Sequence, residues 1–198
     1  MNLRSLTEIG LECGTDKASL HRYTDFYHSL LSPIRHDRIS MVEIGVDGGE
    51  SIRMWSEFFT HSESQIIGVD IHDKGGNLGR GKFVLGDATN PNFIYDFAKA
   101  HGPFELIVDD GSHFSNQQKD SLRLLWPHLL PKGLWISEDC HSSFHYPWTT
   151  PEEISFVESM GDLVVNLMEK GAGHCGVPTE TDIEEIVFRK SLVVIKKR

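Results

Sequence analysis

The sequence is poor in cysteine. It has three cysteines in 198 residues, Cys13, Cys140 and Cys175, and no Cys-x-x-Cys pair. We therefore expect neither a disulfide framework nor a cysteine zinc site, and the natural compartment for such a chain is the reducing cytoplasm. No run of 18 apolar residues is present, and Met1–Ser5 does not begin the apolar stretch of a secretory signal. A membrane partner is therefore not expected.

Positive charge is also scarce. Lysine and arginine together number 19 against 29 acidic residues, which gives a net charge of −10. Proteins bind nucleic-acid phosphates with basic faces, and here the basic cluster is Lys196–Arg198, which we interpret as a solvated tail. A nucleic-acid substrate is therefore not expected. The length suits one domain with a sizeable core, so we predict that residues 1–198 form a single domain.

Short apolar runs alternate with helical patterns along most of the chain. Nearly continuous apolar runs are typical of strands buried on both faces, and the alternation predicts βαβ units in a doubly wound α/β sheet. Near the C-terminus, two strand-like runs joined by Lys190–Ser191 predict an antiparallel hairpin. The predicted strands are Met41–Val46, Gln65–Asp70, Lys82–Asp87, Phe104–Asp109, Gly133–Ser137, Glu185–Arg189 and Leu192–Ile195.

Helical spacing of apolar residues predicts four helices. The first would pack outside the main sheet and make residues 1–36 a helical N-terminal cap. Pro127 should kink the last helix or end it early. The glycine-rich stretch Gly171–Pro178 predicts a mobile loop. The predicted helices are Asp16–Leu31, Gly48–Thr60, Asn90–His101 and Ser115–Leu130.

Acidic residues close two of the predicted strands. Asp109 and Asp110 end one strand, Glu138 and Asp139 end another, and His113 follows the first pair. Neighbouring parallel strands lie about 4.8 Å apart, so these carboxylates would meet at one edge of the sheet. Two carboxylates 4 Å apart repel by roughly 4 kcal/mol at an effective dielectric near 20, and a cation would remove that repulsion. The pattern predicts an oxygen-ligand metal site with a candidate base beside it; the alternative is a pair of ordinary loop starts or helix caps.

A glycine turn joins the first strand to a helix. Its spacing, Gly45-x-x-Gly48-Gly49, lacks the Gly-x-Gly opening of a dinucleotide fingerprint, and Asp47 and Glu50 disfavour a pyrophosphate. Asp70 ends the second strand and can accept hydrogen bonds from ribose hydroxyls. Asp87 ends the third strand, where it could accept from an adenine amino group. Ribose, adenine and a positive centre without phosphates describe S-adenosylmethionine; the alternative is that both aspartates cap strand ends in loops.

Four motifs connect these observations to a known family: Gly14–Lys17, Glu43–Val46, Asp109–His113 and Glu138–Ser142. With them the chain resembles the metal-dependent S-adenosylmethionine O-methyltransferases of macrolide-sugar type, such as the mycinamicin and macrocin enzymes. The resemblance covers residues 14 to about 146, and Leu192–Ile195 fits it too. It implies a class I methyltransferase fold, which is a Rossmann-like three-layer sandwich with a mostly parallel sheet and an antiparallel C-terminal hairpin.

The resemblance also implies roles for individual residues. Asp110, Glu138 and Asp139 would hold Mg²⁺ or Mn²⁺, and His113 would be the catalytic base. Because successive strand residues face opposite ways, Asp109 and Asp110 should not both reach the metal. Asp109 is therefore given a supporting or cofactor-side role. The expected cofactor contacts are Thr15, Lys17, Glu43, Gly45, Ser51, Asp70, Asp87 and Asp109.

Aromatic and histidine residues follow the second acidic pair. His141 and Tyr146 are the candidate acceptor contacts. The alternative for His141 is a plain loop histidine, and the alternative for Phe144–Trp148 is a hydrophobic plug under the loop. The family usually has Thr-Ser-Tyr where this chain has Ser142–Phe144, which removes one tyrosine hydroxyl from the acceptor region. The printed sequence also has no counterpart of the additional N-terminal domain of the mycinamicin type. It is shorter than a typical macrocin-type enzyme, so we expect missing or different acceptor-binding loops.

These observations predict an O-methyltransferase that depends on S-adenosylmethionine and a divalent metal and acts on a hydroxyl of a small, sugar-containing natural product. An alcohol is a weak nucleophile until its proton is removed, which a metal and a histidine base both promote. The alternatives are an aminosugar N-methyltransferase and, more remotely, a nicotinamide-dependent oxidoreductase or a non-catalytic binding module. Related enzymes often form dimers or larger assemblies, so a homo-oligomer is a further expectation.

Overall fold

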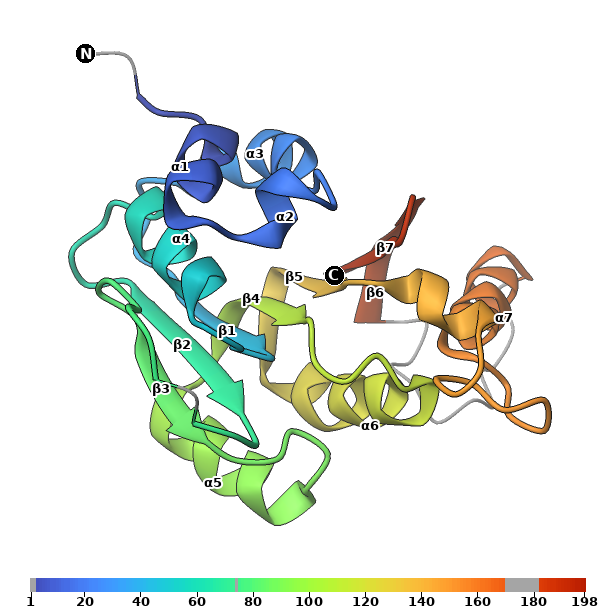
Figure 1. Cartoon of the computed structure of the whole chain (residues 1–198). Coiled ribbons are helices and arrows are strands. Elements are labelled where there is room, and N and C mark those ends of the chain that lie inside the picture. The colour runs from blue at the N-terminus through green and yellow to red at the C-terminus, as the bar shows by residue number, and fades with distance from the viewer. Residues whose placement is uncertain (1–2, 74, 170–181) are drawn as a thin grey trace. The chain divides into compact units, whose positions relative to one another are not determined.

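Figure 1 shows the computed structural model of the chain. The chain divides into two compact units, Met1–Gly86 and Asp87–Arg198. The structure describes residues 3–73, 75–169 and 182–198. The loop expected over Gly171–Pro178 lies outside these described residues. The interpretation of the whole chain as one domain stays a prediction.

The first unit opens with helices and continues into three parallel strands. The central strand, β2, pairs in parallel with β1 on one side and with β3 on the other, so the strand order is β3-β2-β1. Ile44 at the end of β1 lies opposite Val69, next to the end of β2. The elements are α1 (Leu6–Cys13), α2 (Asp16–Ser19), α3 (Thr24–Leu31), η1 (Ser32–Ile34), β1 (Ser40–Ile44), α4 (Glu50–Phe58), β2 (Gln65–Asp70) and β3 (Lys82–Leu85).

Local sequence explains where the N-terminal helices begin and end. A capping box starts α1, in which the Ser5 backbone N–H donates to Glu8 Oε2 at 2.7 Å and the Glu8 N–H donates to Ser5 Oγ at 3.2 Å. Helix α1 ends at Gly14 in a left-handed conformation. The sequence interpretation missed α1. It was also wrong to predict one helix over Asp16–Leu31, because Arg22 at φ 58° interrupts the helical backbone and separates α2 from α3.

In the second unit, the strands of the described residues follow the order β4-β5-β7-β6. Strand β4 runs parallel to β5, whereas β7 is antiparallel to both β5 and β6. The predicted C-terminal hairpin is therefore confirmed. The elements are α5 (Pro91–His101), β4 (Phe104–Asp109), α6 (Ser115–Leu125), η2 (Trp126–His128), β5 (Leu129–Ser137), η3 (Cys140–Phe144), α7 (Phe156–Glu169), β6 (Ile183–Arg189) and β7 (Leu192–Lys197).

One helix end and one whole helix in this unit differ from the predicted bounds. The helix predicted over Ser115–Leu130 ends at Leu125, which confirms the expectation that Pro127 ends it early; the short helix η2 follows and β5 begins at Leu129. Helix α7 was not predicted, although Phe156, Met160 and Leu163 recur at helical spacing and are buried.

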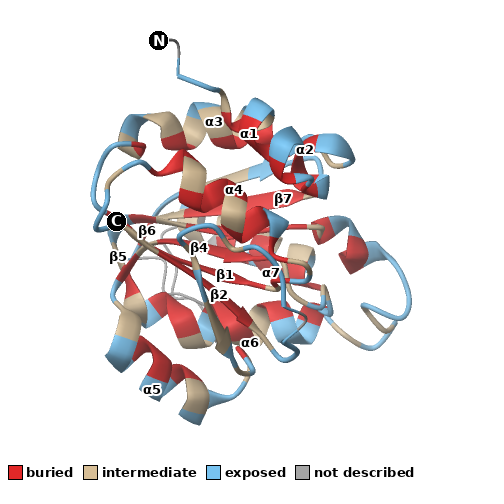
Figure 2. Cartoon of the chain, turned by 60° about the vertical axis from the view of Figure 1, so that its left-hand side comes forward, coloured by how far each residue is buried: buried red, intermediate tan, exposed pale blue. Residues whose placement is uncertain are grey.

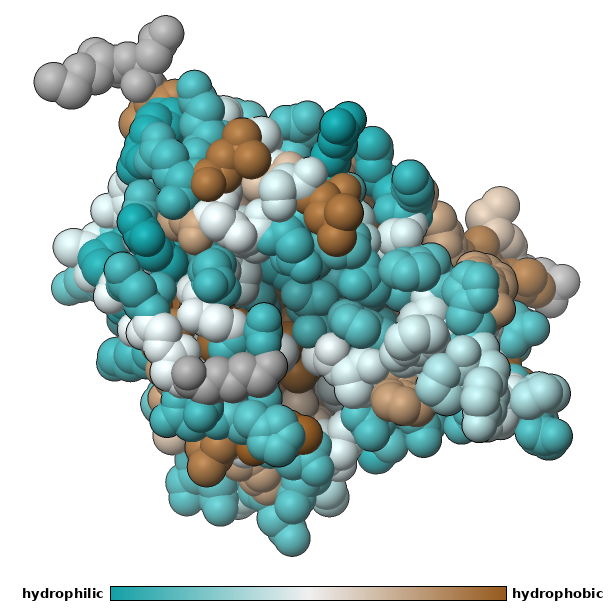
Figure 3. All heavy atoms as spheres, in the orientation of Figure 1, coloured by the Kyte–Doolittle hydropathy of each residue, from teal (hydrophilic) through white to brown (hydrophobic). Residues whose placement is uncertain are grey.

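Burial follows the predicted pattern of strands covered on both faces (Figure 2). Successive residues of β1, β2 and β4 are buried, and the helices are buried on one side and exposed on the other. The face shown in Figure 3 is largely hydrophilic, with hydrophobic side chains in small separate groups. The predicted α/β class, with mostly parallel strands and antiparallel strands at the C-terminus, is confirmed. Within the described residues, no helix combines the length and the apolar character that crossing a bilayer requires.

Candidate metal and cofactor sites

The two strands that end in acidic residues are neighbours, as predicted. Strands β4 and β5 pair in parallel with Asp109 opposite Ser137, so Asp110 and Glu138 leave the sheet at the same level. The Glu138 backbone N–H donates to the Asp109 carbonyl at 2.9 Å, which extends the pairing to this point. The acidic residues of both strands therefore leave the sheet at one edge.

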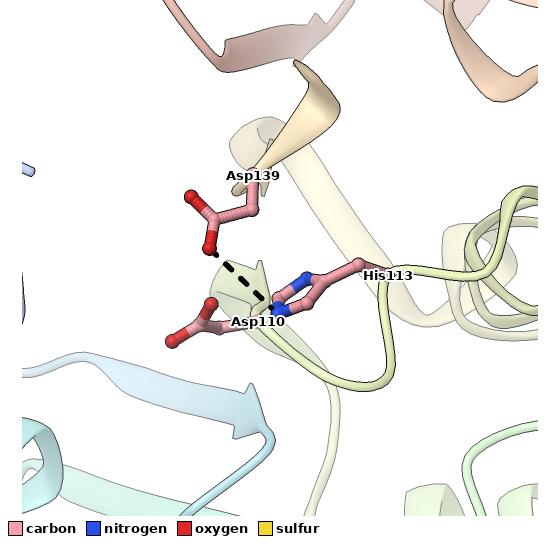
Figure 4. Close-up of side chains that lie close together, drawn as sticks. All are labelled: Asp110, His113 and Asp139. Atoms are coloured by element: carbon pink, nitrogen blue, oxygen red, sulfur yellow. Dashed lines mark ion pairs between the residues drawn. The ribbon is translucent and has the colours of Figure 1, made fainter. Parts of the chain in front are cut away.

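Three side chains gather at this edge: Asp110, His113 and Asp139 (Figure 4). One potential ligand atom from each lies within 4.8 Å of the others. His113 Nε2 lies 3.7 Å from Asp139 Oδ2, the contact drawn as a dashed line in Figure 4. We call these three residues the acidic cluster. Two of the three expected metal ligands and the expected base thus come together.

The backbone of the acidic cluster is held in an uncommon conformation. His113 and Asp139 have φ values of 62° and 49°, in the left-handed region that few non-glycine residues adopt. Such residues cost about 1–3 kcal/mol each and persist where the surroundings hold them. Ser142 supplies part of that hold, because its hydroxyl donates to the His113 carbonyl and its N–H donates to the Asp139 carbonyl, both at 2.9 Å.

Asp109 and Glu138 lie outside the acidic cluster and are buried. Burial raises the pKa of Asp109 to about 7, and the nearby charge of Asp110 adds to that rise. Hydrogen bonds from the Ser121 hydroxyl at 2.5 Å and from the Gly111 N–H at 3.3 Å oppose it. Alternation along the strand explains why Asp109 and Asp110 have different environments. The metal-ligand role of Glu138 stays a prediction.

The chemistry of the acidic cluster fits a divalent cation. Carboxylate oxygens suit Mg²⁺ and Mn²⁺, and an imidazole is a further acceptable donor. Two carboxylates beside one histidine place several potential ligand atoms within 4.8 Å of one another, close enough for one cation to bind them together. His113 Nδ1 is buried and has no hydrogen-bond partner among the described residues, while Nε2 faces the carboxylate of Asp139.

Exposed side chains follow the acidic cluster along the chain. The His141 ring is 54% exposed, and its Nδ1 lies 3.2 Å from Ser191 Oγ and 3.9 Å from Asp139 Oδ1. Phe144 and Tyr146 are 68% and 80% exposed, so these two aromatic residues do not form a hydrophobic plug. Their contact with an acceptor stays a prediction.

The glycine turn of the first unit is anchored by Asp70. Asp70 Oδ2 accepts from the N–H groups of Val46 at 2.9 Å and Asp47 at 3.4 Å, and Oδ1 accepts from the His72 N–H at 2.9 Å. Gly45 has φ 86°, a conformation that a side chain would strain. Asp70 therefore fixes the turn, and its contact with a ribose stays a prediction.

Several expected cofactor contacts are buried beside this turn. Glu43 accepts hydrogen bonds from Ser51 Oγ at 2.5 Å and from Trp55 Nε1, and Lys17 Nζ lies 3.6 Å from its Oε1. Thr15 caps α2, where its Oγ1 accepts from the Lys17 N–H. Trp55 lies on the apolar side of the helix predicted over Gly48–Thr60, and that pattern gives no sign that its indole would donate to Glu43.

In the second unit, Asp87 makes local contacts. It is exposed, and its Oδ1 accepts from the Thr89 N–H at 2.8 Å and from Thr89 Oγ1 at 2.7 Å. This is the loop-capping geometry weighed as the alternative at the sequence level. A contact with adenine stays a prediction for this residue.

Comparison with known proteins identifies the family. Residues 42–140 match a family model described as a methyltransferase domain. The 8-demethyl-8-alpha-L-rhamnosyl tetracenomycin-C 2'-O-methyltransferase of Streptomyces olivaceus is 31% identical over 98% of this chain and 54% of its own length. The mycinamicin VI 2''-O-methyltransferase of Micromonospora griseorubida is 35% identical over 63% of this chain and 33% of its own length. The chain belongs to the methyltransferase domain family.

A solved structure supports the same fold. MycE, a methyltransferase from the mycinamycin biosynthetic pathway solved with Mg, SAH and mycinamycin VI, superposes with a TM-score of 0.85 and 27% identity. The match covers 98% of this chain and 54% of MycE. The predicted methyltransferase fold is therefore confirmed. The chain spans about half the length of this solved relative and of the Streptomyces olivaceus enzyme.

Proposed function

We propose that this protein is an S-adenosylmethionine- and divalent-metal-dependent O-methyltransferase that acts on a sugar hydroxyl of a small natural product. The observation that carries this proposal is the acidic cluster, which joins two carboxylates and a histidine after neighbouring strands. The names of the relatives add support, because they describe O-methyltransferases of rhamnosylated tetracenomycin and of mycinamicin. MycE was solved with Mg and SAH bound.

The residues of the acidic cluster have distinct proposed roles. Asp110 and Asp139 would hold the cation, with Glu138 as a further ligand. When bound, a divalent cation lowers the pKa of a neighbouring hydroxyl and orients it. His113 Nε2 takes the proton of the acceptor hydroxyl, and Asp139, 3.7 Å away, stabilises the imidazolium that results. His141 and Tyr146 are the proposed acceptor contacts.

The cofactor supplies a methyl group on a positively charged sulfur. In the transfer, the acceptor oxygen forms a bond to the methyl carbon while the carbon–sulfur bond breaks, and the sulfur leaves as a neutral thioether. In the first unit, Gly45 lets the backbone approach the cofactor and Asp70 accepts from the ribose. Asp87 and Asp109 are the proposed cofactor-side residues of the second unit.

A methyl-transfer assay tests the proposal. The chain is incubated with methyl-labelled S-adenosylmethionine, Mg²⁺ and rhamnosylated aromatic polyketides, beside analogues that carry an aminosugar. We expect label on a sugar hydroxyl, loss of transfer in EDTA and recovery when Mg²⁺ is restored. Full transfer in EDTA would contradict the metal role, and label found on the amine instead would favour the N-methyltransferase.

Cofactor choice and assembly are tested separately. Calorimetric titration should show binding of S-adenosylhomocysteine and none of NAD⁺; the reverse result would favour the oxidoreductase. We further propose a cytoplasmic enzyme that forms a homo-oligomer. Sedimentation at two protein concentrations tests the oligomer, and a single monomeric species would contradict it.

A further inference from the structure

Glu43 is the centre of a fully buried polar group in the first unit. Its carboxylate is 0% exposed, although it lies on β1 two residues before the left-handed Gly45. Ser51 Oγ and Trp55 Nε1, both on α4, donate to its two oxygens. The carboxylate therefore connects the strand before the glycine turn to the helix after it.

Lys17 brings the N-terminal helices into the same group. Its side chain is 2% exposed, and Nζ lies 3.6 Å from Glu43 Oε1. Lysine is almost never buried to this degree unless it is paired. Lys17 lies on α2, the four-residue helix that follows Gly14 and is capped by Thr15. This ion pair thus joins the segment 14–19 to β1.

Lys17 and Glu43 carry opposite charges that offset each other at 3.6 Å. Removing two ions from water is costly, and a buried pair persists only when attraction and additional hydrogen bonds offset that cost. Glu43 has such bonds from Ser51 and Trp55. A direct contact with a charged ligand would compete with this balance. The pair is therefore better suited to holding the turn than to contacting the cofactor.

We infer that Lys17 and Glu43 are positioning residues whose buried ion pair holds segment 14–19 against the β1–α4 turn and so sets the turn geometry that S-adenosylmethionine binds. This inference rests on the proposed function. It departs from the expectation that both side chains contact the cofactor directly. It also predicts that the two residues act as one unit.

The test is a double-mutant cycle with two readouts. Lys17→Met, Glu43→Gln and the double variant are compared with wild type by calorimetric titration of S-adenosylmethionine and by amide hydrogen exchange of residues 14–19. The matched control is Arg53→Met/Glu57→Gln on the same helix α4, which removes the partly exposed Arg53–Glu57 pair, with side chains 36% and 27% exposed, together with the contact of Glu57 to Arg4.

Each single variant should weaken cofactor binding by about tenfold or more and speed exchange in segment 14–19, because it removes one charge of a buried ion pair. The double variant should regain most of both losses, and the control should keep wild-type affinity. Three outcomes would overturn the inference: additive losses in the double variant, weaker binding without faster exchange, or faster exchange without weaker binding.

Failure of the proposed function gives a different result. In that case the wild-type chain itself does not bind S-adenosylmethionine in the titration. The exchange readout still decides the pairing of the two side chains. Unchanged exchange in Lys17→Met would overturn the pairing, and faster exchange that is reversed in the double variant would support it.

Discussion

We call Lys17, Glu43, Ser51 and Trp55 the Glu43 group. The Glu43 group and the acidic cluster both contain carboxylates at or near strand ends, but they differ in the balance of their charges and in their exposure. Around Glu43, a lysine and two hydrogen-bond donors match one carboxylate, and Lys17 and Glu43 are at most 2% exposed. The acidic cluster holds two carboxylates and one histidine, and His113 and Asp139 are 25% and 16% exposed. The first arrangement is typical of a scaffold and the second of a ligand site.

The largest expected effect tests the acidic cluster as a catalytic site. His113→Ala should lower kcat by about 10²–10⁴-fold, the usual contribution of a general base, with unchanged affinity for S-adenosylmethionine. The measurement is steady-state methyl transfer beside a calorimetric titration. His36→Ala, an exposed histidine of the first unit, is the control and should keep wild-type kcat. Near-normal turnover of His113→Ala would remove this residue from the mechanism.

The next effect tests the Glu43 group as a scaffold. Glu43→Gln should lower the free energy of unfolding by about 3–5 kcal/mol, because it breaks a buried ion pair by removing one of its two charges. Urea unfolding followed by circular dichroism gives the value. Glu57→Gln removes partly exposed ion pairs with Arg53 and Arg4, and should cost at most about 1 kcal/mol for each pair. If both variants lose the same free energy of unfolding, burial of the Lys17–Glu43 pair does not increase its contribution to stability.

Metal addition should stabilise the protein through the acidic cluster. Mg²⁺ at one hundred times its dissociation constant raises the free energy of unfolding by about 2.7 kcal/mol, because the ion binds the folded chain. Thermal unfolding at increasing Mg²⁺ concentration measures this effect. Asp139→Asn should abolish most of the increase, whereas Asp162→Asn, on α7, should leave it intact. If neither Mg²⁺ nor Mn²⁺ changes the thermal stability of the wild-type chain, this result would argue against the metal site.

The smallest effect has the opposite sign to that of Glu43→Gln. In EDTA, Asp110→Asn should raise the free energy of unfolding by up to about 1 kcal/mol, because it relieves repulsion between partly exposed carboxylates. Urea unfolding in EDTA, at low and at high salt, measures the change, and salt should shrink it. A clear loss of stability in Asp110→Asn would show that this carboxylate contributes to the scaffold instead.

The sequence alone predicted most of the fold. Strands β2 and β4 were predicted with their observed bounds, because continuous apolar runs closed by aspartate mark them clearly. Boundaries that depend on local backbone conformation were harder to predict. Arg22 adopts φ 58° where the pattern gives no glycine, and β5 starts at Leu129 directly after the proline turn. Helix α1 was missed although the capping residues Ser5 and Glu8 are visible in the sequence.

For the candidate site, the sequence determined which types of side chain lie at the strand ends, and the tertiary structure decided which of these side chains contact one another. Motif spacing placed Asp110, His113 and Asp139 together, because parallel neighbouring strands must end at one edge. Which atom faces which could not be predicted: side chains such as Lys17 and Trp55 meet Glu43 from helices whose packing no local pattern specifies. Local sequence fixes periodicity and turns, but pairing of buried charges depends on contacts between segments far apart in the chain, and only the folded chain brings these together.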